Sequence, residues 1–407
     1  MPAEVIDAEA LTELKKVTFA VHWTSPALRT RMGIRFPRLR SLLWEPIKAA
    51  RRLVKRGTAT TCTPRDPPEQ GMGNVAVAMN SQRRLGDAQI KAWFAPDKLV
   101  MLVSKLARRY RPKAIIVEYI FSAPVFAAVP ADTLKIVDTI DVFSRKEDQV
   151  LSYGIADPLA CGEEEERHAL LHADVIVAIQ SREARLLKDL VPEREVILVG
   201  IDLDVVGGPR EGEVIPDSIV VVASDNALNV HGFGAFLREC WPVIKRARPE
   251  ATLHVVGRVG DACRVDDPAI RYSGWIDDLD QIYREASVVI NPTVAGTGLK
   301  IKSVQALAHG KPLVAWPNGV EGLDHAAEPP FRECRSWQEF AHAVVSLLTS
   351  DTERRELSAL ALAYAKKEFA ADAVYAALRV RLDAAIAVQA GAQARCVSSE
   401  RVAPSLG

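Results

Sequence analysis

The sequence has little cysteine, few aromatic residues and no long apolar run. Its six cysteines among 407 residues show no C-x-x-C spacing, so neither a disulfide framework nor a zinc ribbon is expected. The first residues lack an apolar core, which argues against a signal peptide. The most apolar segment, residues 114–131, is interrupted by Glu118 and two prolines. A buried strand followed by a loop is therefore expected there, rather than a membrane span.

Charge is balanced overall but unevenly distributed. The chain has 52 basic and 52 acidic residues, yet residues 1–112 hold 21 Lys and Arg against 9 Asp and Glu. The densest segment, residues 29–57, has ten basic residues and only Glu45 as an acid. Such a segment, with leucines and aromatics among the charges, is typical of peripheral contact with an anionic membrane. The solvated face of an ordinary packed helix is the open alternative. No recognition motif accompanies the charge, so nucleic acid is not expected as a partner.

Apolar strands alternate with helical segments along the chain, which predicts an α/β fold with parallel sheets. Residues 207–218 are rich in glycine, proline and charge and are expected to link two halves. A chain of 407 residues is long enough for two cores. We expect two Rossmann-like domains facing each other across a cleft, with residues 1–207 in the first and 208–370 in the second. Residues 371–390 are expected to form a helix that returns to the first domain, before a loose tail at 391–407.

The stretch GTGLKIKSVQALAHGKPLV, residues 296–314, follows an expected strand at 287–292. Its glycines permit unusual backbone angles, and a helix beginning near Lys300 would offer free N–H groups at its start. Lys300 and Lys302 add positive charge where helices usually prefer acids. An anion site, most naturally for a diphosphate, explains the two cations. Lysines that are merely solvated are the alternative.

At this point the chain resembles bacterial family 4 glycosyltransferases of GT-B architecture, from about Pro112 to Leu323. The motifs that carry the resemblance include VDTIDVFSRKEDQ, ASDNALNVHGFGAF, YSGWIDDLDQIYREASVVINP and GTGLKIKSVQALAHGKPLVAWPNGVEGL. The resemblance implies a nucleotide-sugar donor held mainly by the second domain, usual retention of anomeric configuration, and no cofactor or bound metal ion. Carried over by position, the implied donor-binding residues are Asn229, Gly257, Arg258, Trp275, Ile276, Thr297, Gly298, Lys300, Lys302 and Gln305.

The sequence departs from the family pattern at three positions. The paired glutamates of the family would fall on Thr297 and Gln305, and a histidine that contacts the sugar would fall on Ile140. Gln305 can still accept a hydrogen bond from a ribose hydroxyl through its carbonyl oxygen. Thr297 cannot replace a carboxylate, and Ile140 offers no polar atom.

Polar residues remain around Ile140, and Asp141 is the expected catalytic carboxylate, which positions the acceptor hydroxyl or takes its proton. The alternative is that Asp141 only caps a turn or the next helix. Thr139, Ser144 and Arg145 are expected in the acceptor or active-site loop. Arg145 would assist the diphosphate or an acidic acceptor, or form an ion pair with nearby acids.

Two functions follow from this sequence. The first is a cytoplasmic glycosyltransferase, peripheral on the inner face of the membrane, that moves a sugar from a nucleotide to a glycan or lipid-linked acceptor in surface polysaccharide or glycolipid biosynthesis. The second is a catalytically weakened GT-B protein that binds nucleotide or glycan, or partners a transferase. The lysines and glycines favour donor binding in both, because electrostatic stabilisation dominates this chemistry.

Overall fold

The computed structural model describes residues 86–154, 159, 161–208, 212–323 and 328–387. Contacts divide the chain into one unit at Met1–Ala78 and another at Met79–Gly407, and every described residue belongs to the second. The basic segment at 29–57 lies outside the described residues, and so does the segment KVTFAVHW at 16–23, which the sequence predicts to be the first strand. Among the residues described, no helix is both long and apolar enough to cross a membrane.

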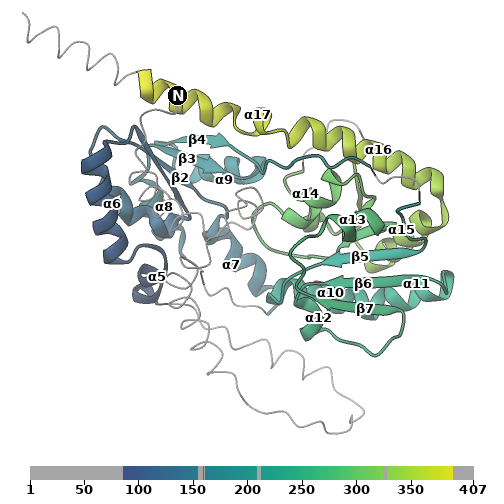
Figure 1. Cartoon of the computed structure of the whole chain (residues 1–407). Coiled ribbons are helices and arrows are strands. Elements are labelled where there is room, and N and C mark those ends of the chain that lie inside the picture. Colours follow the sequence, from purple (N-terminus) through teal and green to yellow (C-terminus); the bar gives the residue numbers. More distant parts are fainter. Residues whose placement is uncertain (1–85, 155–158, 160, 209–211, 324–327, 388–407) are drawn as a thin grey trace, which may run out of the picture. The chain divides into compact units, whose positions relative to one another are not determined.

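The first sheet is parallel, with its four described strands side by side in chain order (Figure 1). They are β1 (Ala114–Glu118), β2 (Leu134–Asp138), β3 (Val175–Ala178) and β4 (Glu195–Leu198). Successive side chains point to opposite faces of a strand. Accordingly Val137 and Ile176 pack in one core, while their neighbours Ile136 and Val177 pack in another. The sheet is thus apolar on both faces, as parallel sheets usually are.

Helices of the first half lie between these strands or precede them. Their bounds are α5 (Asp87–Phe94), α6 (Asp97–Tyr110), the 3-10 helix η2 (Ile120–Ala128), α7 (Phe143–Leu151), α8 (Glu163–Leu170) and α9 (Ser181–Leu190). The apolar stretch after Glu118 forms η2, which was expected as a loop. Its residues Ile120, Val125 and Phe126 are buried, which explains the apolar run without a membrane.

The second sheet is also parallel and runs in the order β10-β9-β8-β5-β6-β7. Its strands are β5 (Ser218–Val222), β6 (Thr252–Val256), β7 (Ile270–Gly274), β8 (Val288–Asn291), β9 (Leu313–Ala315) and β10 (Arg332–Glu333). The helices between them are α10 (Ala227–Glu239), α11 (Trp241–Ala247), α12 (Val259–Ala262), α13 (Asp280–Glu285), α14 (Ile301–Ala308) and the 3-10 helix η3 (Pro317–Val320). This is the strand order of a Rossmann fold.

Alternation along β5 sends side chains to two cores. Ile219 and Val221 pack with α10, α11 and the later helix α15 (Trp337–Thr349). Val220 packs on the opposite face with α13, α14 and α16 (Asp351–Glu368), so helices cover both faces (Figure 1). The alternation in the sequence also predicts a helix near residues 232–247, and the structure differs from this prediction in two respects. The helix starts earlier, at Ala227, and breaks at Cys240, because Pro242 suits the first turn of a new helix.

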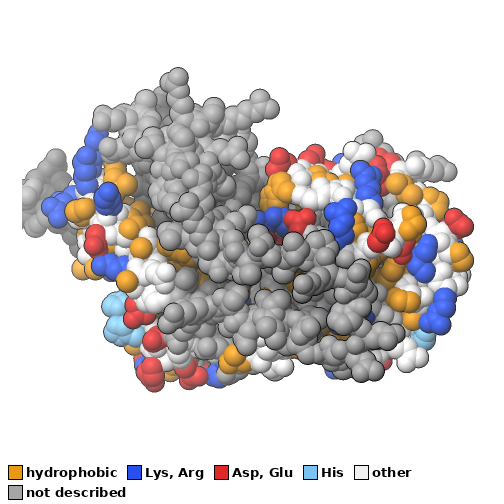
Figure 2. All heavy atoms as spheres, turned by 90° about the horizontal axis from the view of Figure 1, so that it is seen from below, with side chains coloured by type: hydrophobic (Ala, Val, Ile, Leu, Met, Phe, Trp, Pro, Cys, Tyr) orange, Lys and Arg blue, Asp and Glu red, His pale blue; other side chains and the backbone are white. Residues whose placement is uncertain are grey.

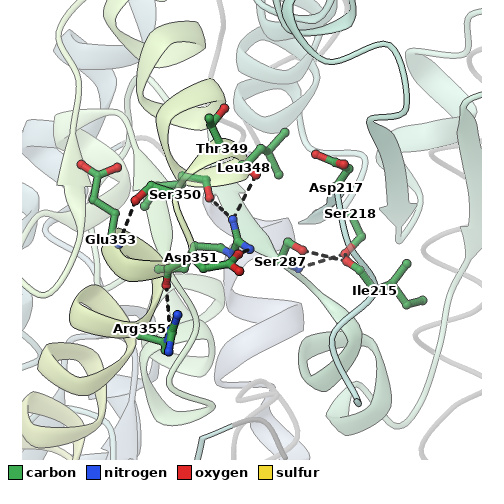
Figure 3. Close-up of polar contacts among 12 residues, drawn as sticks. Ile215, Asp217, Ser218, Ser287, Leu348, Thr349, Ser350, Asp351, Glu353 and Arg355 are labelled. Carbon is green, nitrogen blue, oxygen red and sulfur yellow. Dashed lines mark hydrogen bonds and ion pairs between the residues drawn. The ribbon is translucent and has the colours of Figure 1, made fainter. Parts of the chain in front are cut away.

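Two junctions fix the start of the second sheet and the turn into α16 (Figure 3). The hydroxyl groups of Ser218 and Ser287 donate to the Ile215 carbonyl oxygen at 2.6 and 2.7 Å, and the Ser287 amide donates to Ser218 Oγ at 2.9 Å. Ser350 Oγ accepts from the Glu353 amide and caps α16. These bonds satisfy backbone groups at the ends of a strand and a helix.

The last described residues pack on the first sheet. After α16 and α17 (Ala371–Val374), residues 376–387 are helical. Val374, Leu378 and Leu382 pack with the core formed by β2 and β3, and Arg381 Nε donates to Glu195 at 2.7 Å. The expected α/β architecture with two Rossmann-like domains is confirmed.

Candidate functional site

The candidate site lies where the strand order of the second sheet reverses. Strands β5 and β8 are neighbours, and the chain continues from β5 towards β6 on one side and from β8 towards β9 on the other. Ligands of open α/β sheets bind outside the carboxyl ends of such strands. The loop after β5 leads into α10 and the loop after β8 leads into α14, so these two loops are the first place to look for function.

Two glycines allow close contacts at the carboxyl edge of the sheet, Gly232 of α10 with the loop after β8, and Gly257, after β6, with the loop after β5. A Cβ atom on Gly232 would lie 2.1 Å from the Pro292 carbonyl oxygen, and one on Gly257 would lie 2.1 Å from the Ala223 carbonyl oxygen. Gly257 also has φ +97°, a conformation that favours glycine. Any side chain at either position would push the loops apart, so glycine is a geometric requirement at the site.

Lys302 is held between these loops. Its Nζ donates to Asn229 Oδ1 of α10 at 2.7 Å and to Thr293 Oγ1 of the loop after β8 at 2.9 Å. Asn229 Nδ2 in turn donates to Ser224 Oγ at 3.1 Å, which turns Oδ1 toward the lysine. Both partners of the ammonium are neutral. No ion pair with a carboxylate is found for Lys302 among the residues the structure describes.

Burial, and to a smaller extent the charge of Lys300, lowers the pKa of Lys302 to about 7. A buried ammonium without a counterion is unfavourable. An anion beside it would restore the ordinary pKa, because opposite charge favours the protonated form. The geometry is therefore that of a cation prepared for an anionic ligand.

Lys300, by contrast, folds back on its own loop. Its Nζ donates to the carbonyl oxygens of Gly296, Thr297 and Gly298 at 3.3, 3.1 and 3.0 Å. Burial lowers its pKa to about 8, although the carboxylates of Asp141 and Glu183 act in the opposite direction. Lys300 thus fixes the shape of the loop in this structure.

Gln305 lies on α14 beside Tyr283. The tyrosine hydroxyl donates to Gln305 Oε1 at 3.3 Å, so the oxygen expected for the ribose already has one partner. His309 closes the same helix, stacked on the Tyr283 ring and 2.9 Å from Asp280. The role of Gln305 toward a ribose stays a prediction.

Three more of the implied donor-binding residues, Arg258, Trp275 and Ile276, lie after β6 and β7. Arg258 pairs with Asp225 at 2.5 Å, which joins the loops after β5 and β6. Trp275 is 68% exposed, and its Nε1 donates to Asp277 at 2.8 Å. Ile276 follows it and is half-buried. The indole face is thus open at the carboxyl edge of the sheet.

The loop after β2 brings Asp141 to the glycine loop, residues Gly296–Gly298, between β8 and α14. Thr297 Oγ1 donates to Asp141 Oδ1 at 2.8 Å, and Lys146 Nζ is 3.5 Å from Asp141 Oδ2. Ile140 has φ 62°, a left-handed backbone that is strained for a β-branched residue. Thr139 is buried and donates to the Val177 carbonyl oxygen at 2.9 Å, which anchors the loop to β3.

Two other residues of this loop have different surroundings. The amides of Phe143 and Ser144 donate to Glu166 at 2.9 Å each. Glu166, and not Asp141, therefore caps α7. Arg145 is exposed and pairs with Glu163 at 2.9 Å, which is the ion-pair alternative left open for it.

The sequence reasoning missed four residues that touch the predicted ones, namely Gln180, Glu183, Thr293 and Lys146. Glu183 accepts a hydrogen bond from the Gly298 amide at 2.6 Å, and Thr293 shares Lys302 with Asn229. A polar residue just beyond the carboxyl end of a strand is a signal for such positions. Thr293 follows β8, and Gln180 and Glu183 follow β3, so that rule would have found them.

Comparison with known proteins bears on the fold and on residues 216–350. Residues 216–350 match the family model described as glycosyl transferases group 1. No curated protein matches the sequence. Three GT-B glycosyltransferase structures share the fold. They are a mutant of S. aureus TarM in complex with UDP, alpha-GlcNAc-glycerol and Fondaparinux, the sucrose-phosphate synthase of Thermosynechococcus elongatus, and Anabaena HepE in complex with UDP and glucose.

These likenesses are in fold rather than in sequence. The TM-scores are 0.55, 0.56 and 0.55, at 10%, 16% and 14% identity. The alignments cover 70%, 79% and 70% of this chain, and 58%, 82% and 81% of the other chains, so just over half of the length of TarM is spanned. Residues 216–350 thus match the glycosyl transferases group 1 model, within a chain that has the GT-B fold of two Rossmann-like domains.

Proposed function

We propose that the protein is a glycosyltransferase that takes a sugar from a nucleotide-sugar donor. The observation that carries the proposal is Lys302, a half-buried ammonium at the reversal point of the second sheet whose two partners, Asn229 Oδ1 and Thr293 Oγ1, are both neutral. A diphosphate would supply the missing negative charge. The relatives in the family matched by residues 216–350 are glycosyltransferases, and the TarM and HepE structures of the same fold contain UDP.

The residues around Lys302 suit a diphosphate leaving group. Helix α14 begins at Ile301 with Lys300 as its cap residue and has no acid in its first turn, so its free N–H groups add positive potential. Charge that develops on a departing diphosphate would be stabilised by this potential and by Lys302. We therefore propose a metal-independent reaction, in which these groups take the role that a divalent cation has in other transferases.

Asp141 is the proposed catalytic carboxylate. Thr297 holds one of its oxygens, and Lys146 lies near the other, so the carboxylate is fixed in orientation. It would position the acceptor hydroxyl or accept its proton. Retention of anomeric configuration is proposed with it, on the resemblance to the family alone.

The acceptor is proposed to be a glycan or a lipid-linked sugar in surface polysaccharide or glycolipid biosynthesis. The resemblance supports this assignment, and the basic segment at residues 29–57 supports a peripheral position on the inner face of a membrane. Lys and Arg side chains are interspersed with Asp and Glu on the visible part of the face in Figure 2. The membrane proposal therefore depends on residues 29–57.

A second candidate function is a weakened GT-B protein that binds nucleotide or glycan without efficient transfer. Three observations favour it. Ile140 is apolar where the family has a histidine, and Thr297 and Gln305 are uncharged where the family has glutamates. The Lys300 ammonium donates its hydrogen bonds to carbonyl oxygens of its own loop. The two candidates agree on donor binding and differ in turnover.

Thermal unfolding with UDP, GDP and ADP tests donor binding. One of them is expected to raise the unfolding temperature of the wild-type protein, since a ligand that binds only the native state stabilises it. Lys302→Ala should remove the shift, whereas Lys366→Ala, on the exposed face of α16, should keep it. The absence of a shift with all three nucleotides would overturn the donor site.

Hydrolysis of a nucleotide sugar then separates the two candidates. Slow hydrolysis that Asp141→Asn abolishes, with nucleotide affinity unchanged, supports the transferase. Donor binding without hydrolysis or transfer across a broad acceptor panel supports the binding protein instead.

A further inference from the structure

The first turn of α9 lies against the loops that follow β8 and β9. Glu183 Oε1 accepts from the Gly298 amide at 2.6 Å, and Gln180 Nε2 donates to the Gly298 carbonyl oxygen at 3.5 Å. Arg182, between them, forms an ion pair with Glu321. One turn of a helix from the first half thus binds two loops of the second half, one of them the glycine loop Gly296–Gly298.

Glycine is required where these surfaces meet. Gly298 has φ +75°, and a Cβ atom there would lie 2.7 Å from Asp141 Oδ1. Gly322, in the loop after β9, has φ +84°, and its Cβ would lie 2.6 Å from the Cβ of Gln180. The glycine loop is therefore packed closely against the loop after β2, and the loop after β9 is packed closely against Gln180 at the start of α9.

Glu183 is buried, with 2% of its surface exposed. Its pKa is raised to about 7, mainly by burial and also by the charge of Asp141, while the Gly298 amide, Lys300 and Gln180 act in the opposite direction. In the described part of the chain, its second oxygen Oε2 and the neighbouring Gln180 Oε1 are buried without a hydrogen bond. Burial of a carboxyl group with one oxygen lacking a hydrogen bond is unfavourable, so Glu183 is expected to have a role beyond packing.

We propose that Glu183 is a positioning residue for the donor site, which holds the glycine loop by its Gly298 amide in the conformation that presents Thr297 to Asp141 and closes Lys300 over the loop carbonyls. This inference rests on the proposed donor site. It assigns to the first half of the molecule an acid for a loop that has none of its own, because the loop carries Thr297 where the family carries a glutamate.

The protonation state of Glu183 should change the grip on the loop. An ionised carboxylate is a stronger acceptor for an N–H group than a protonated one. The charged groups that face it are Asp141 on the loop after β2 and Lys300 before α14. As the pH rises through about 7, Glu183 ionises, so the Gly298 amide should be held more tightly above this pH than below it.

Hydrogen exchange of the full-length protein tests the grip directly, with no ligand present. Protection of the peptide that contains Gly298, corrected for intrinsic exchange, should rise about threefold or more between pH 6 and pH 8 in the wild type. In Glu183→Gln, which keeps an acceptor but cannot ionise, protection should be independent of pH. In Glu183→Ala it should fall about tenfold or more at both pH values. Equal protection in all three proteins would overturn the proposal.

UDP binding links the grip to the donor site. Glu183→Ala should weaken UDP affinity about tenfold, and Glu183→Gln should restore it to within about threefold of the wild type, a rescue that general loss of packing would not give. Asp189→Asn, an exposed acid on the same helix, is the matched control and should change neither readout. Unchanged UDP affinity in Glu183→Ala, with wild-type binding intact, would overturn the positioning role. If the wild type itself binds no nucleotide, the donor site fails, while hydrogen exchange still decides whether Glu183 holds the loop.

Discussion

A lysine lies at each end of helix α14, Lys311 buried and Lys302 half-buried, and the partners of the two ammonium groups differ. Beyond its carboxyl end, Lys311 is 1% exposed and donates to the carbonyl oxygens of Arg284 and Ala286 at 2.6 and 3.1 Å. These carbonyls close helix α13 and carry partial negative charge. At its amino end, Lys302 donates to a side-chain amide and a hydroxyl between two loops.

Burial lowers the pKa of both lysines, to about 8 for Lys311 and about 7 for Lys302. A depressed pKa therefore does not distinguish a structural lysine from a functional one. The partners do, because Lys311 satisfies backbone oxygens that would otherwise be buried without a hydrogen bond, whereas Lys302 faces the place where a ligand is expected. Experiments on the two ends of α14 test whether Lys302 binds a ligand while Lys311 has only a structural role.

The largest expected difference is between Lys302→Met and Lys311→Met. Lys302→Met should weaken UDP binding about 100-fold or more, because it removes the cation from a desolvated anion site. Lys311→Met should leave UDP affinity within about threefold of the wild type but destabilise the fold by about 1–3 kcal/mol, because it strands the carbonyl oxygens of α13. Isothermal titration and chemical unfolding measure the two effects. A similar loss of affinity in both variants would remove the distinction.

Two glycines that flank helix α14, Gly298 before it and Gly310 after it, are expected to differ as the two lysines do. Gly298→Ala should reduce nucleotide-sugar turnover about tenfold or more, since φ +75° is costly for alanine and its Cβ would meet Asp141 Oδ1 at 2.7 Å. Gly310→Ala, with φ +61° and a flexible Leu362 side chain as its nearest neighbour, should cost about 1–2 kcal/mol of stability and spare turnover. Steady-state kinetics beside thermal unfolding checks both, and lost turnover in Gly310→Ala would contradict the assignment.

Thr297 gives a smaller expected effect. Thr297→Val removes the hydroxyl that holds Asp141 Oδ1 at 2.8 Å and should lower kcat about tenfold, with little change in KM for the donor. Thr297→Ser keeps the hydroxyl and should stay within about threefold of the wild type. A pair of variants with equal kcat would show that the hydrogen bond has no part in turnover.

The smallest expected effect is on the number of protons that the protein takes up when it binds UDP. The pKa of Lys302 lies below its unfolded value, so the unfolded chain binds a proton that the native chain lacks between about pH 7 and 10.5. Stability should therefore rise with pH across this window. A bound diphosphate would favour the protonated form of Lys302, so UDP binding to the wild type at pH 8.5 should be accompanied by proton uptake. Lys302→Met should take up fewer protons than the wild type, by up to about one proton per UDP bound. Titration in buffers of different ionisation enthalpy measures the uptake, and equal uptake in both proteins would contradict the role of Lys302.

The sequence predicts the second sheet well because its strands are continuous apolar runs bounded by glycine, proline and charge. Strand β8 lies within the range 287–292 expected from the sequence, and helix α14 begins at Ile301, next to the start expected near Lys300. The short strand β10, of two residues, has too little pattern to be predicted.

The pairings within the site join distant segments of the chain and could not be predicted. Asp141 and Thr297 are 156 residues apart, and Glu183 and Gly298 are 115 apart. Nothing in the local pattern of either segment reveals its partner. The sequence shows which chemistry each loop can offer, whereas the folded chain decides which side chains share a hydrogen bond.

The contact between residues 371–387 and the first sheet has a consequence for synthesis. Ile136, Val175 and Val177 line a face of that sheet that is covered by Val374, Leu378 and Leu382. The ribosome makes these covering residues roughly 200 positions after the strands they protect, and domains often fold as they emerge. During most of translation this face would be bare, so chains truncated before residue 371 should bind chaperones or aggregate, even though every strand of both sheets is present.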